Sequence, residues 1–380
     1  MKLRILRWPL LLGVVLLSSC AESSRDPTPR ERWTEAQADA WYAAQPWPVG
    51  ANFVPSTAIN QLEMWQADTY DEATIDRELG WAAGLGFNTT RVFLHDLLWK
   101  EDPEAFLGRI DRFLAVAERH GISVMLVLFD GVWNPVPVAG AQPERTPHVH
   151  NSQWVQSPGV EILGNLERHD ELEPYVKGVI RRFRRDPRVL VWDLFNEPDN
   201  PNILSYADVE LRPDTKAAAA VALLRKAFVW ARSVDPMQPI TAGVWQGKAE
   251  WGNPAGLSPM NELMITESDV LSFHSYDPPE LVTDQVADLQ RYGRPLLCTE
   301  YMARSAGSTF QGVLPIFDQA GVGAYNWGLV SGRSQTIYSW GSWFTMDSAD
   351  ADPWFHDVLY PDGTPYDNEE ADLIRQLTGP

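Results

Sequence analysis

Two glutamates, Glu197 and Glu300, each stand at the end of a short apolar run that is typical of a buried strand. The runs span residues 190–196 and 296–299. If both are strands of one barrel, the two carboxyl groups converge over one mouth. Hydrolysis of a glycosidic bond needs such a pair, one protonated and one ionised. A lone strand-end glutamate is more often a cap or an ion-pair partner, but the sequence Asn196-Glu197-Pro198 counts against that interpretation.

Further polar and aromatic side chains lie at or close to the ends of other predicted strands. They could hold substrate hydroxyl groups or stack on the apolar face of a sugar ring. Some have structural alternatives: Arg91 as an ion pair at the barrel bottom, His274 as a satisfied core histidine, and the tryptophans as core. The candidates for substrate binding are Arg91, Asp130, Asn196, Trp245, His274, Tyr276 and Trp327.

These residues need a scaffold that brings strand ends together. Short apolar runs alternate with amphipathic helical stretches, which favours βαβ units and a parallel sheet. An open doubly wound sheet is the rival, but no Gly-rich dinucleotide turn follows the first strand. We therefore predict an α/β fold, a (β/α)8 TIM barrel. The predicted strands span 50–54, 88–94, 123–129, 189–195, 240–244, 270–273, 295–299 and 323–327, and the predicted helices 72–85, 104–120, 172–185, 215–234, 281–292, 309–320 and 369–377.

No domain boundary interrupts this alternation, so residues 46–380 are predicted to form one catalytic domain. Two of its connections are long. The loops 131–170 and 331–365 both follow strands and are rich in aromatic residues. Loops of this length are usually functional, and they would lie on the face that carries the strand ends. They could leave an open groove or close a pocket, so the sequence does not decide between internal and terminal cleavage.

The motif over residues 192–198 resembles the fourth-strand motif of glycoside hydrolase family 5, the cellulase-like family of clan A retaining β-glycosidases. The resemblance covers residues 49–329 and implies that Glu197 is the general acid/base and Glu300 the nucleophile. It also implies that Asn196 holds the sugar 2-hydroxyl group.

Other family positions match in the expected order. The resemblance implies an arginine near the nucleophile at Arg91, a His-x-Tyr pair at His274 and Tyr276, and an aromatic platform at Trp327. One position departs: the family usually has a histidine after the third strand, where this chain has Asp130. That change puts the substrate in doubt and leaves the core machinery intact.

We therefore expect a retaining glycoside hydrolase that acts on gluco-, manno- or xylo-type β-glycans and needs no cofactor. One alternative is a surface glycan-binding lipoprotein without activity, and another is a transglycosylase that uses the same residues. His148 and His150, with Asp130 and Glu144, could be drawn as a metal site, but a loop that lines a sugar cleft is the simpler interpretation, so no metal is expected.

The composition of the chain limits the classes of ligand that it is expected to bind. The chain has 380 residues and a formal net charge of −20, which argues against a nucleic-acid binder because such proteins need a basic face. Many of its 17 tryptophans are expected to be core residues or flat stacking platforms, which suits an oligo- or polysaccharide ligand. We expect a monomer. Of the two cysteines, Cys298 lies in an apolar run and is interpreted as a core residue.

The N-terminus has the pattern of an export signal. Residues 1–19 combine three basic residues with an apolar stretch too short for a comfortable membrane span. The sequence that ends at Cys20 resembles a bacterial lipobox, which implies acylation of this cysteine. Residues 20–45 would then form a tether and lead-in, and the membrane would be contacted through the lipid anchor only. Ala21 favours the outer membrane or cell surface if the cell is Gram-negative.

The lipobox generates the first prediction. Cys20→Ser should move the protein from the membrane fraction to the soluble fraction, because no other residue can carry the acyl chains that stabilise anchoring. Fractionation of cells followed by immunodetection measures the shift. Ser24→Ala, which changes a position beyond the lipobox, should leave the distribution unchanged, and membrane association of Cys20→Ser would refute the anchor.

Overall fold

The computed structural model describes residues 28–345 and 351–379. The predicted export signal and Cys20 lie outside this part of the chain, and so does the start of the predicted tether. No helix in the described ranges is both long enough and apolar enough to cross a membrane.

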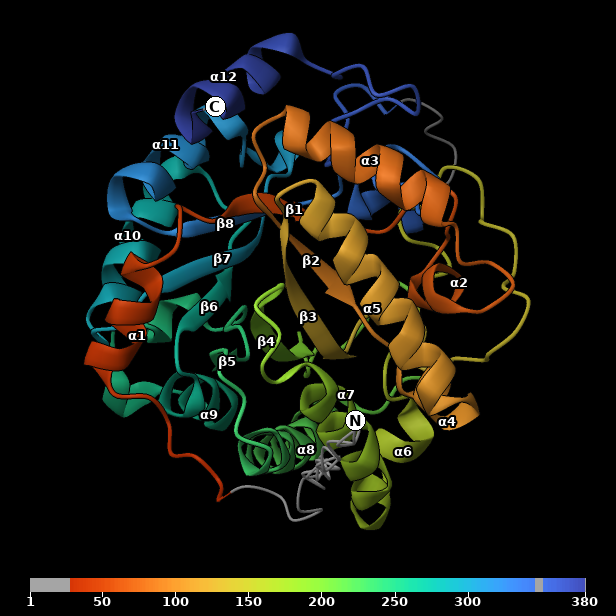
Figure 1. Cartoon of the computed structure of the whole chain (residues 1–380), viewed down its shortest axis with the longest axis vertical. Helices are drawn as coiled ribbons and strands as arrows, with labels where there is room; N and C mark the ends of the chain where they lie inside the picture. The colour runs from red at the N-terminus through yellow and green to blue at the C-terminus, as the bar shows by residue number, and fades with distance from the viewer. Residues whose placement is uncertain (1–27, 346–350, 380) are drawn as a thin grey trace, which may run out of the picture.

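Eight strands form one sheet in the order β5-β4-β3-β2-β1-β8-β7-β6, and every paired neighbour is parallel. Figure 1 shows them at the centre of the molecule with the helices around them. The prediction of eight strands is confirmed, with small shifts of their ends. Their bounds are β1 Val49–Asn52, β2 Thr89–Phe93, β3 Ser123–Asp130, β4 Val189–Asn196, β5 Ile240–Thr241, β6 Leu271–His274, β7 Leu296–Tyr301 and β8 Gly323–Trp327.

The sheet closes on itself between β5 and β6. No regular ladder joins these two strands, but an isolated parallel bridge pairs Val244 with Phe273. The amide of Val244 donates to the carbonyl of Ser272 at 3.0 Å, and the amide of His274 donates to the carbonyl of Val244 at 3.0 Å. The predicted (β/α)8 TIM barrel is therefore confirmed.

The seven predicted helices are present as α3, α5, α7, α8, α10, α11 and α12, whereas α1, α9 and the short helices α2, α4 and α6 were not predicted. Their starts follow from local chemistry. At α5, for example, the Asp102 carboxylate accepts from the amide of Ala105 and Pro103 occupies the first turn. The helix bounds are α1 Glu35–Ala43, α2 Gln61–Trp65, α3 Glu72–Gly84, α4 Asp96–Glu101, α5 Pro103–Arg119, α6 Val160–Leu163, α7 Glu173–Phe183, α8 Pro213–Ser233, α9 Pro259–Glu267, α10 Pro279–Gln290, α11 Phe310–Ala320 and α12 Asn368–Thr378.

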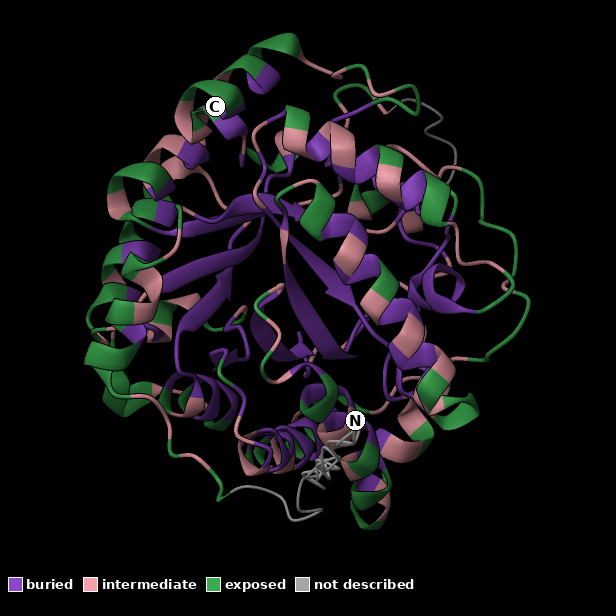
Figure 2. Ribbon diagram, in the orientation of Figure 1, coloured by how far each residue is buried: buried purple, intermediate pink, exposed green. Residues whose placement is uncertain are grey.

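Burial follows the layers of the barrel. The strands are buried along nearly their whole length, whereas the helices alternate between buried and exposed residues (Figure 2). Helix α5 shows the reason: Phe106, Ile110, Phe113 and Leu114 recur at helical spacing and all face the core. Apolar burial of this kind is what holds the strand ends, and the side chains they carry, in fixed positions.

The N-terminal segment covers the bottom of the barrel. Trp33, Trp41 and Tyr42 pack against buried side chains near the starts of β3, β4, β7 and β8. Arg30 forms an ion pair with Asp269, whose side chain has no exposed surface. The same carboxylate accepts from the amides of Trp33 and Ile240, both at 2.8 Å. The second half of the segment predicted as a tether is thus packed on the barrel.

This arrangement predicts that Asp269 stabilises the fold. Asp269→Ala should lower the free energy of unfolding by about 3–5 kcal/mol, because it leaves a partly buried guanidinium and two amides without their acceptor. Thermal or denaturant unfolding measures the loss. Asp76→Ala, which removes a half-exposed carboxylate paired with Arg119, should have little effect. Equal melting of the two variants would contradict the role given to Asp269.

Candidate active site

A cavity of about 660 Å³ opens at the carboxyl ends of the strands. Its size is typical of a site for a small ligand. Most of the predicted site residues line it, and they come from β4, β6, β7 and β8 and the loop after β5. Those residues are Asn196, Glu197, Trp245, His274, Tyr276, Glu300 and Trp327. Arg91 and Asp130 do not line the cavity and lie buried behind it.

Arg91 is fully buried on β2 and links four neighbouring side chains. Its Nε and Nη2 donate to Asp193 Oδ2 at 3.0 and 2.8 Å, and Nη1 donates to Glu300 Oε1 at 3.0 Å. Nη1 also donates to Asn52 Oδ1 at 2.8 Å, and Nη2 to Asn196 Oδ1 at 2.7 Å. Burial alone would lower the pKa of Arg91, but the carboxylates of Asp193 and Glu300 raise it above its ordinary value.

Glu300 ends the apolar part of β7 and carries hydrogen bonds on both oxygens. Arg91 donates to Oε1, and the Tyr276 hydroxyl group donates to Oε2 at 2.8 Å. Burial raises the pKa of Glu300 above its ordinary value, and an ionised Glu197 adds to the rise, while Arg91 and Tyr276 oppose it. These two donors stabilise the charged form directly, so Glu300 is the carboxylate of the pair built to hold the negative charge.

Glu197 follows β4 in a left-handed backbone conformation with φ at 39°. Its Oε2 accepts from Asn200 Nδ2 at 2.7 Å, and no cation lies within hydrogen-bond distance of it in the described structure. Burial raises the pKa of Glu197 to about 7, although the Asn200 hydrogen bond acts in the opposite direction. A carboxyl group in this environment is protonated over much of the neutral range and can donate a proton.

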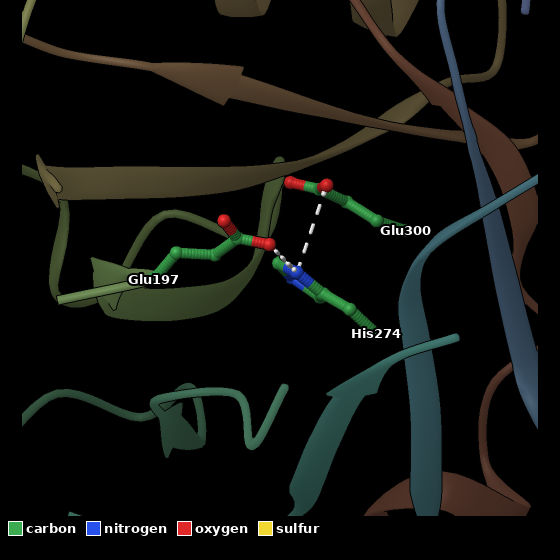
Figure 3. A group of neighbouring side chains, drawn as sticks. All are labelled: Glu197, His274 and Glu300. Atoms are coloured by element: carbon green, nitrogen blue, oxygen red, sulfur yellow. Dashed lines mark hydrogen bonds and ion pairs between the residues drawn. The ribbon is translucent and has the colours of Figure 1, made fainter. Parts of the chain in front are cut away.

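His274 lies between the two carboxyl groups, as Figure 3 shows. Its Nδ1 is 2.9 Å from Glu197 Oε1 and 3.6 Å from Glu300 Oε2. Burial lowers the pKa of His274 to about 4, so the imidazole is neutral and leaves the charge difference between the carboxyl groups intact. One ligand atom from each of these residues lies within 4.8 Å of the others.

This trio is also the one group in the described ranges that resembles a metal site. Its chemistry favours another use, because both oxygens of Glu300 already accept hydrogen bonds and the Arg91 guanidinium lies against Oε1. His148 and His150 belong to no such group among the described residues.

Asn196 is held in one orientation by its neighbours. A guanidinium only donates, so the oxygen of the amide faces Arg91, and Nδ2 donates to Asp130 Oδ1 at 3.0 Å. The second Nδ2 hydrogen remains for a ligand. Asp130 also accepts from Trp154 Nε1 at 2.6 Å, and burial raises its pKa to about 7. Asp130 was predicted to bind substrate, but its place in the structure is that of a residue that positions Asn196.

Aromatic rings form much of the cavity wall. Trp327 is partly exposed and meets Phe93 and Trp154 edge-on, with ring centroids 5.6 and 5.7 Å away. Trp245 lies on the far side, where its Nε1 donates to Asp199 at 2.9 Å. Trp133, Trp154 and Trp340 from the two long loops complete the wall. Flat, apolar surfaces of this kind suit the C–H faces of sugars.

Sequence reasoning missed several residues of the site. Asp193 is part of the motif that drew attention to Glu197, and an acidic residue inside a buried strand was an available signal for a partner of Arg91. No comparable signal marked Asn52 or Asn200, because short amides near strand ends are common. Their roles depend on contacts with residues distant in the sequence, such as Asn52 with Arg91.

Solved structures with the same fold include several enzymes that act on mannosides. The exo-beta-1,4-mannosidase Op5Man5 from Opitutaceae bacterium strain TAV5 has a TM-score of 0.57 and 20% identity, over 87% of this chain and 59% of that chain. A GH5_18 structure from Streptomyces cattleya in complex with Manb1-4GlcNAc has a TM-score of 0.58 and 13% identity, over 87% of this chain and 80% of that chain. The endo-beta-1,4-mannanase from Thermotoga petrophila has a TM-score of 0.55 and 14% identity, over 89% and 77%.

At these identities the structures show a shared fold, and this chain spans 59% of the length of the Opitutaceae mannosidase. A comparison with curated protein sequences finds no match. The sequence profile described as Cellulase (glycosyl hydrolase family 5) matches residues 51–333, which includes all eight strand ends. The chain therefore belongs to glycosyl hydrolase family 5 and is a glycoside hydrolase.

Proposed function

We propose that the chain hydrolyses β-glycosides with retention of configuration, by double displacement. The observation that carries this proposal is the separation of the two carboxyl groups, since an oxygen of Glu197 and an oxygen of Glu300 lie within 4.8 Å in one cavity. Retaining enzymes hold their carboxyl groups about 5–5.5 Å apart, whereas inverting enzymes need about 6.5–9.5 Å to admit a water molecule. The short separation supports direct attack by a carboxylate.

In the first step, Glu300 attacks the anomeric carbon and the bond to the glycosidic oxygen breaks. Glu197 donates its proton to that oxygen, so the leaving group departs as a neutral alcohol. In the second step, the ionised Glu197 takes a proton from water, and the resulting hydroxide displaces Glu300 from the anomeric carbon. In this mechanism the free N–H of Asn196 binds the sugar 2-hydroxyl group, an interaction that strengthens in the transition state.

The proposed mechanism applies equally to gluco-, manno- and xylo-type β-glycans, so it does not select one of them as the substrate. The similar structures of mannosidases and a mannanase make β-mannosides the first substrates to test. Turnover of any aryl β-glycoside separates an enzyme from the non-catalytic glycan-binding alternative. Product analysis with and without an added acceptor sugar separates hydrolysis from transglycosylation.

We also propose that the enzyme is exported and anchored through Cys20.

Because the two carboxyl groups have different roles, their removal should affect turnover and product configuration differently. Glu300→Ala should lower turnover by roughly 10⁴-fold or more, because no glycosyl-enzyme can form, and azide should restore a product of inverted configuration. Glu197→Ala should lose roughly 10²–10⁴-fold on substrates with poor leaving groups. On an activated aryl glycoside, the intermediate should accumulate, and azide should then give a product of retained configuration. NMR of the first product measures each outcome.

The exposed Glu262 on α9 provides a matched control. Glu262→Ala should keep wild-type turnover and give no azide product. Identical behaviour of Glu197→Ala and Glu300→Ala, or an inverted first product from the wild type, would refute the retaining mechanism.

The two environments also predict the pH dependence of kcat/KM. Activity should fall as the pH rises through about 7, where Glu197 loses the proton it must donate. It should also fall at low pH as Glu300 becomes protonated, at a higher pH than an ordinary glutamate would give, because burial raises its pKa. Burial raises the pKa of Asp130 to about 7 as well. The pH profile of the wild type alone therefore does not distinguish the titration of Glu197 from that of Asp130 in the alkaline limb.

Glu197→Gln distinguishes these two titrations. With an activated aryl glycoside under single-turnover conditions, the alkaline limb should disappear in this variant while the acid limb remains. An alkaline limb that persists would assign the titration to another group and contradict the role given to Glu197.

A further inference from the structure

The described parts of the two long loops, residues 131–170, 331–345 and 351–365, are bonded to each other over one side of the cavity mouth. They follow β3 and β8, and β1 and β2 lie between those strands in the sheet. A groove that left the cavity on this side would have to pass between the loops. The loops are joined there by hydrogen bonds from His148 N to Gln335 Oε1 (3.0 Å), Asn151 N to Ser334 O (2.9 Å), His150 N to Ser342 Oγ (3.0 Å), and Gln335 Nε2 to Thr146 O (2.7 Å) and Val149 O (2.8 Å).

Aromatic side chains also pack across this junction, and together with the hydrogen bonds they form a continuous wall on this side of the cavity. Trp133 stacks on Trp343 with centroids 5.7 Å apart and planes at 24°. Trp340 meets Phe355 edge-on at 4.8 Å and also meets Tyr276 at 5.0 Å. Since Tyr276 donates to the proposed nucleophile, the wall stands directly beside that end of the catalytic pair. The cavity is therefore closed on the side of Glu300.

The opposite side of the catalytic pair is different. Next to Glu197 the cavity is lined by Asn200, Trp245 and Lys248, from segments that follow β4 and β5. In a retaining site the attacked sugar lies over the nucleophile, and its glycosidic oxygen points to the acid. The leaving group therefore extends past Glu197, and the closed side receives the sugar on the non-reducing side of the cleaved bond.

Asn151 is a polar side chain at this closed end with nothing to bind in the protein. It is 1% exposed and lines the cavity beside Trp154 and Trp327. Neither Oδ1 nor Nδ2 of its amide has a hydrogen-bond partner among the described residues. Buried polar groups are nearly always paired, so an amide left unpaired at a ligand cavity indicates that a ligand supplies both a donor and an acceptor. A sugar hydroxyl group provides both.

His150 adds an acceptor next to this amide. Its Nδ1 lies 2.9 Å from the carbonyl oxygen of Tyr338, which only accepts, so Nδ1 carries the ring proton. Burial lowers the pKa of His150 to about 4, which keeps the imidazole neutral. Nε2 is then an acceptor, and His150 lines the same cavity.

We propose that the walled end of the cavity is a closed subsite in which Asn151 and His150 bind the hydroxyl groups of the terminal non-reducing sugar. The enzyme then cleaves glycans from that end and does not cut inside a chain. This assignment rests on the proposed function, because it takes the positions of the leaving group and the attacked sugar from the roles of Glu197 and Glu300.

The test uses cello-, manno- and xylo-oligosaccharides labelled at the reducing end, each with a free or a chemically blocked non-reducing end, together with aryl β-glycosides. We expect the labelled chains to shorten by one constant unit per cleavage and the blocked chains to resist. Internal cleavage, seen as mixed product lengths or as turnover of blocked chains, would overturn the closed subsite and leave the proposed function standing. Absence of turnover on every substrate would overturn both.

Asn151→Gly tests the amide itself. Asn151 has φ at 46°, a left-handed conformation that glycine adopts without steric cost, so the variant removes the side chain with little backbone strain. We expect kcat/KM on free oligosaccharides to fall about tenfold or more, as for the loss of hydrogen bonds to the substrate. His148→Gly is the matched control, since it lies in the same loop with φ at 64° and does not line the cavity. Equal losses in the two variants, at equal melting temperatures, would assign the effect to loop flexibility and overturn the role of Asn151.

Discussion

A buried guanidinium must have all of its N–H groups bonded, and this requirement organises the centre of the barrel. Arg91 meets it with bonds to Asn52 on β1, to Asp193 and Asn196 on β4, and to Glu300 on β7, so that three other strands are tied to β2. Removal of any one acceptor would leave a donor unpaired in the interior. The relative positions of the strand ends are therefore set by hydrogen-bond geometry as well as by apolar packing.

The same network separates the chemistry of the two glutamates. Glu300 accepts hydrogen bonds from the Arg91 guanidinium and the Tyr276 hydroxyl group. The hydrogen-bond partners of Glu197 are the amide of Asn200 and the neutral imidazole of His274. Both carboxyl groups are buried to a similar degree, so burial alone would not distinguish them. The difference comes from the direct donors, and it allows one carboxyl group to stay ionised while its neighbour keeps a proton.

The fold was predictable because each strand of a closed barrel is a short apolar run that contrasts with the amphipathic helix after it. The strand-end position of Glu197 and Glu300 followed from the same pattern. The role of Asp130 did not, since the sequence places it at a strand end and gives no sign that Asn196 stands in front of it. The loop junction at Asn151 was equally hidden, because irregular segments lack a periodicity that would predict their partners. Helix α1 was missed because it follows a segment rich in serine, proline and charge.

The packing of the N-terminal segment also determines which end of the barrel would face a membrane if Cys20 were acylated. Arg30 and α1 are held at the end of the barrel where the strands begin, while the cavity opens where the strands end. The residues between Cys20 and Thr28 can span at most about 30 Å even when fully extended. An acyl chain on Cys20 would therefore hold the bottom of the barrel next to the bilayer and turn the cavity outward. In that orientation the lipid layer would not obstruct the approach of a glycan chain, and the enzyme would meet its substrate from the aqueous side.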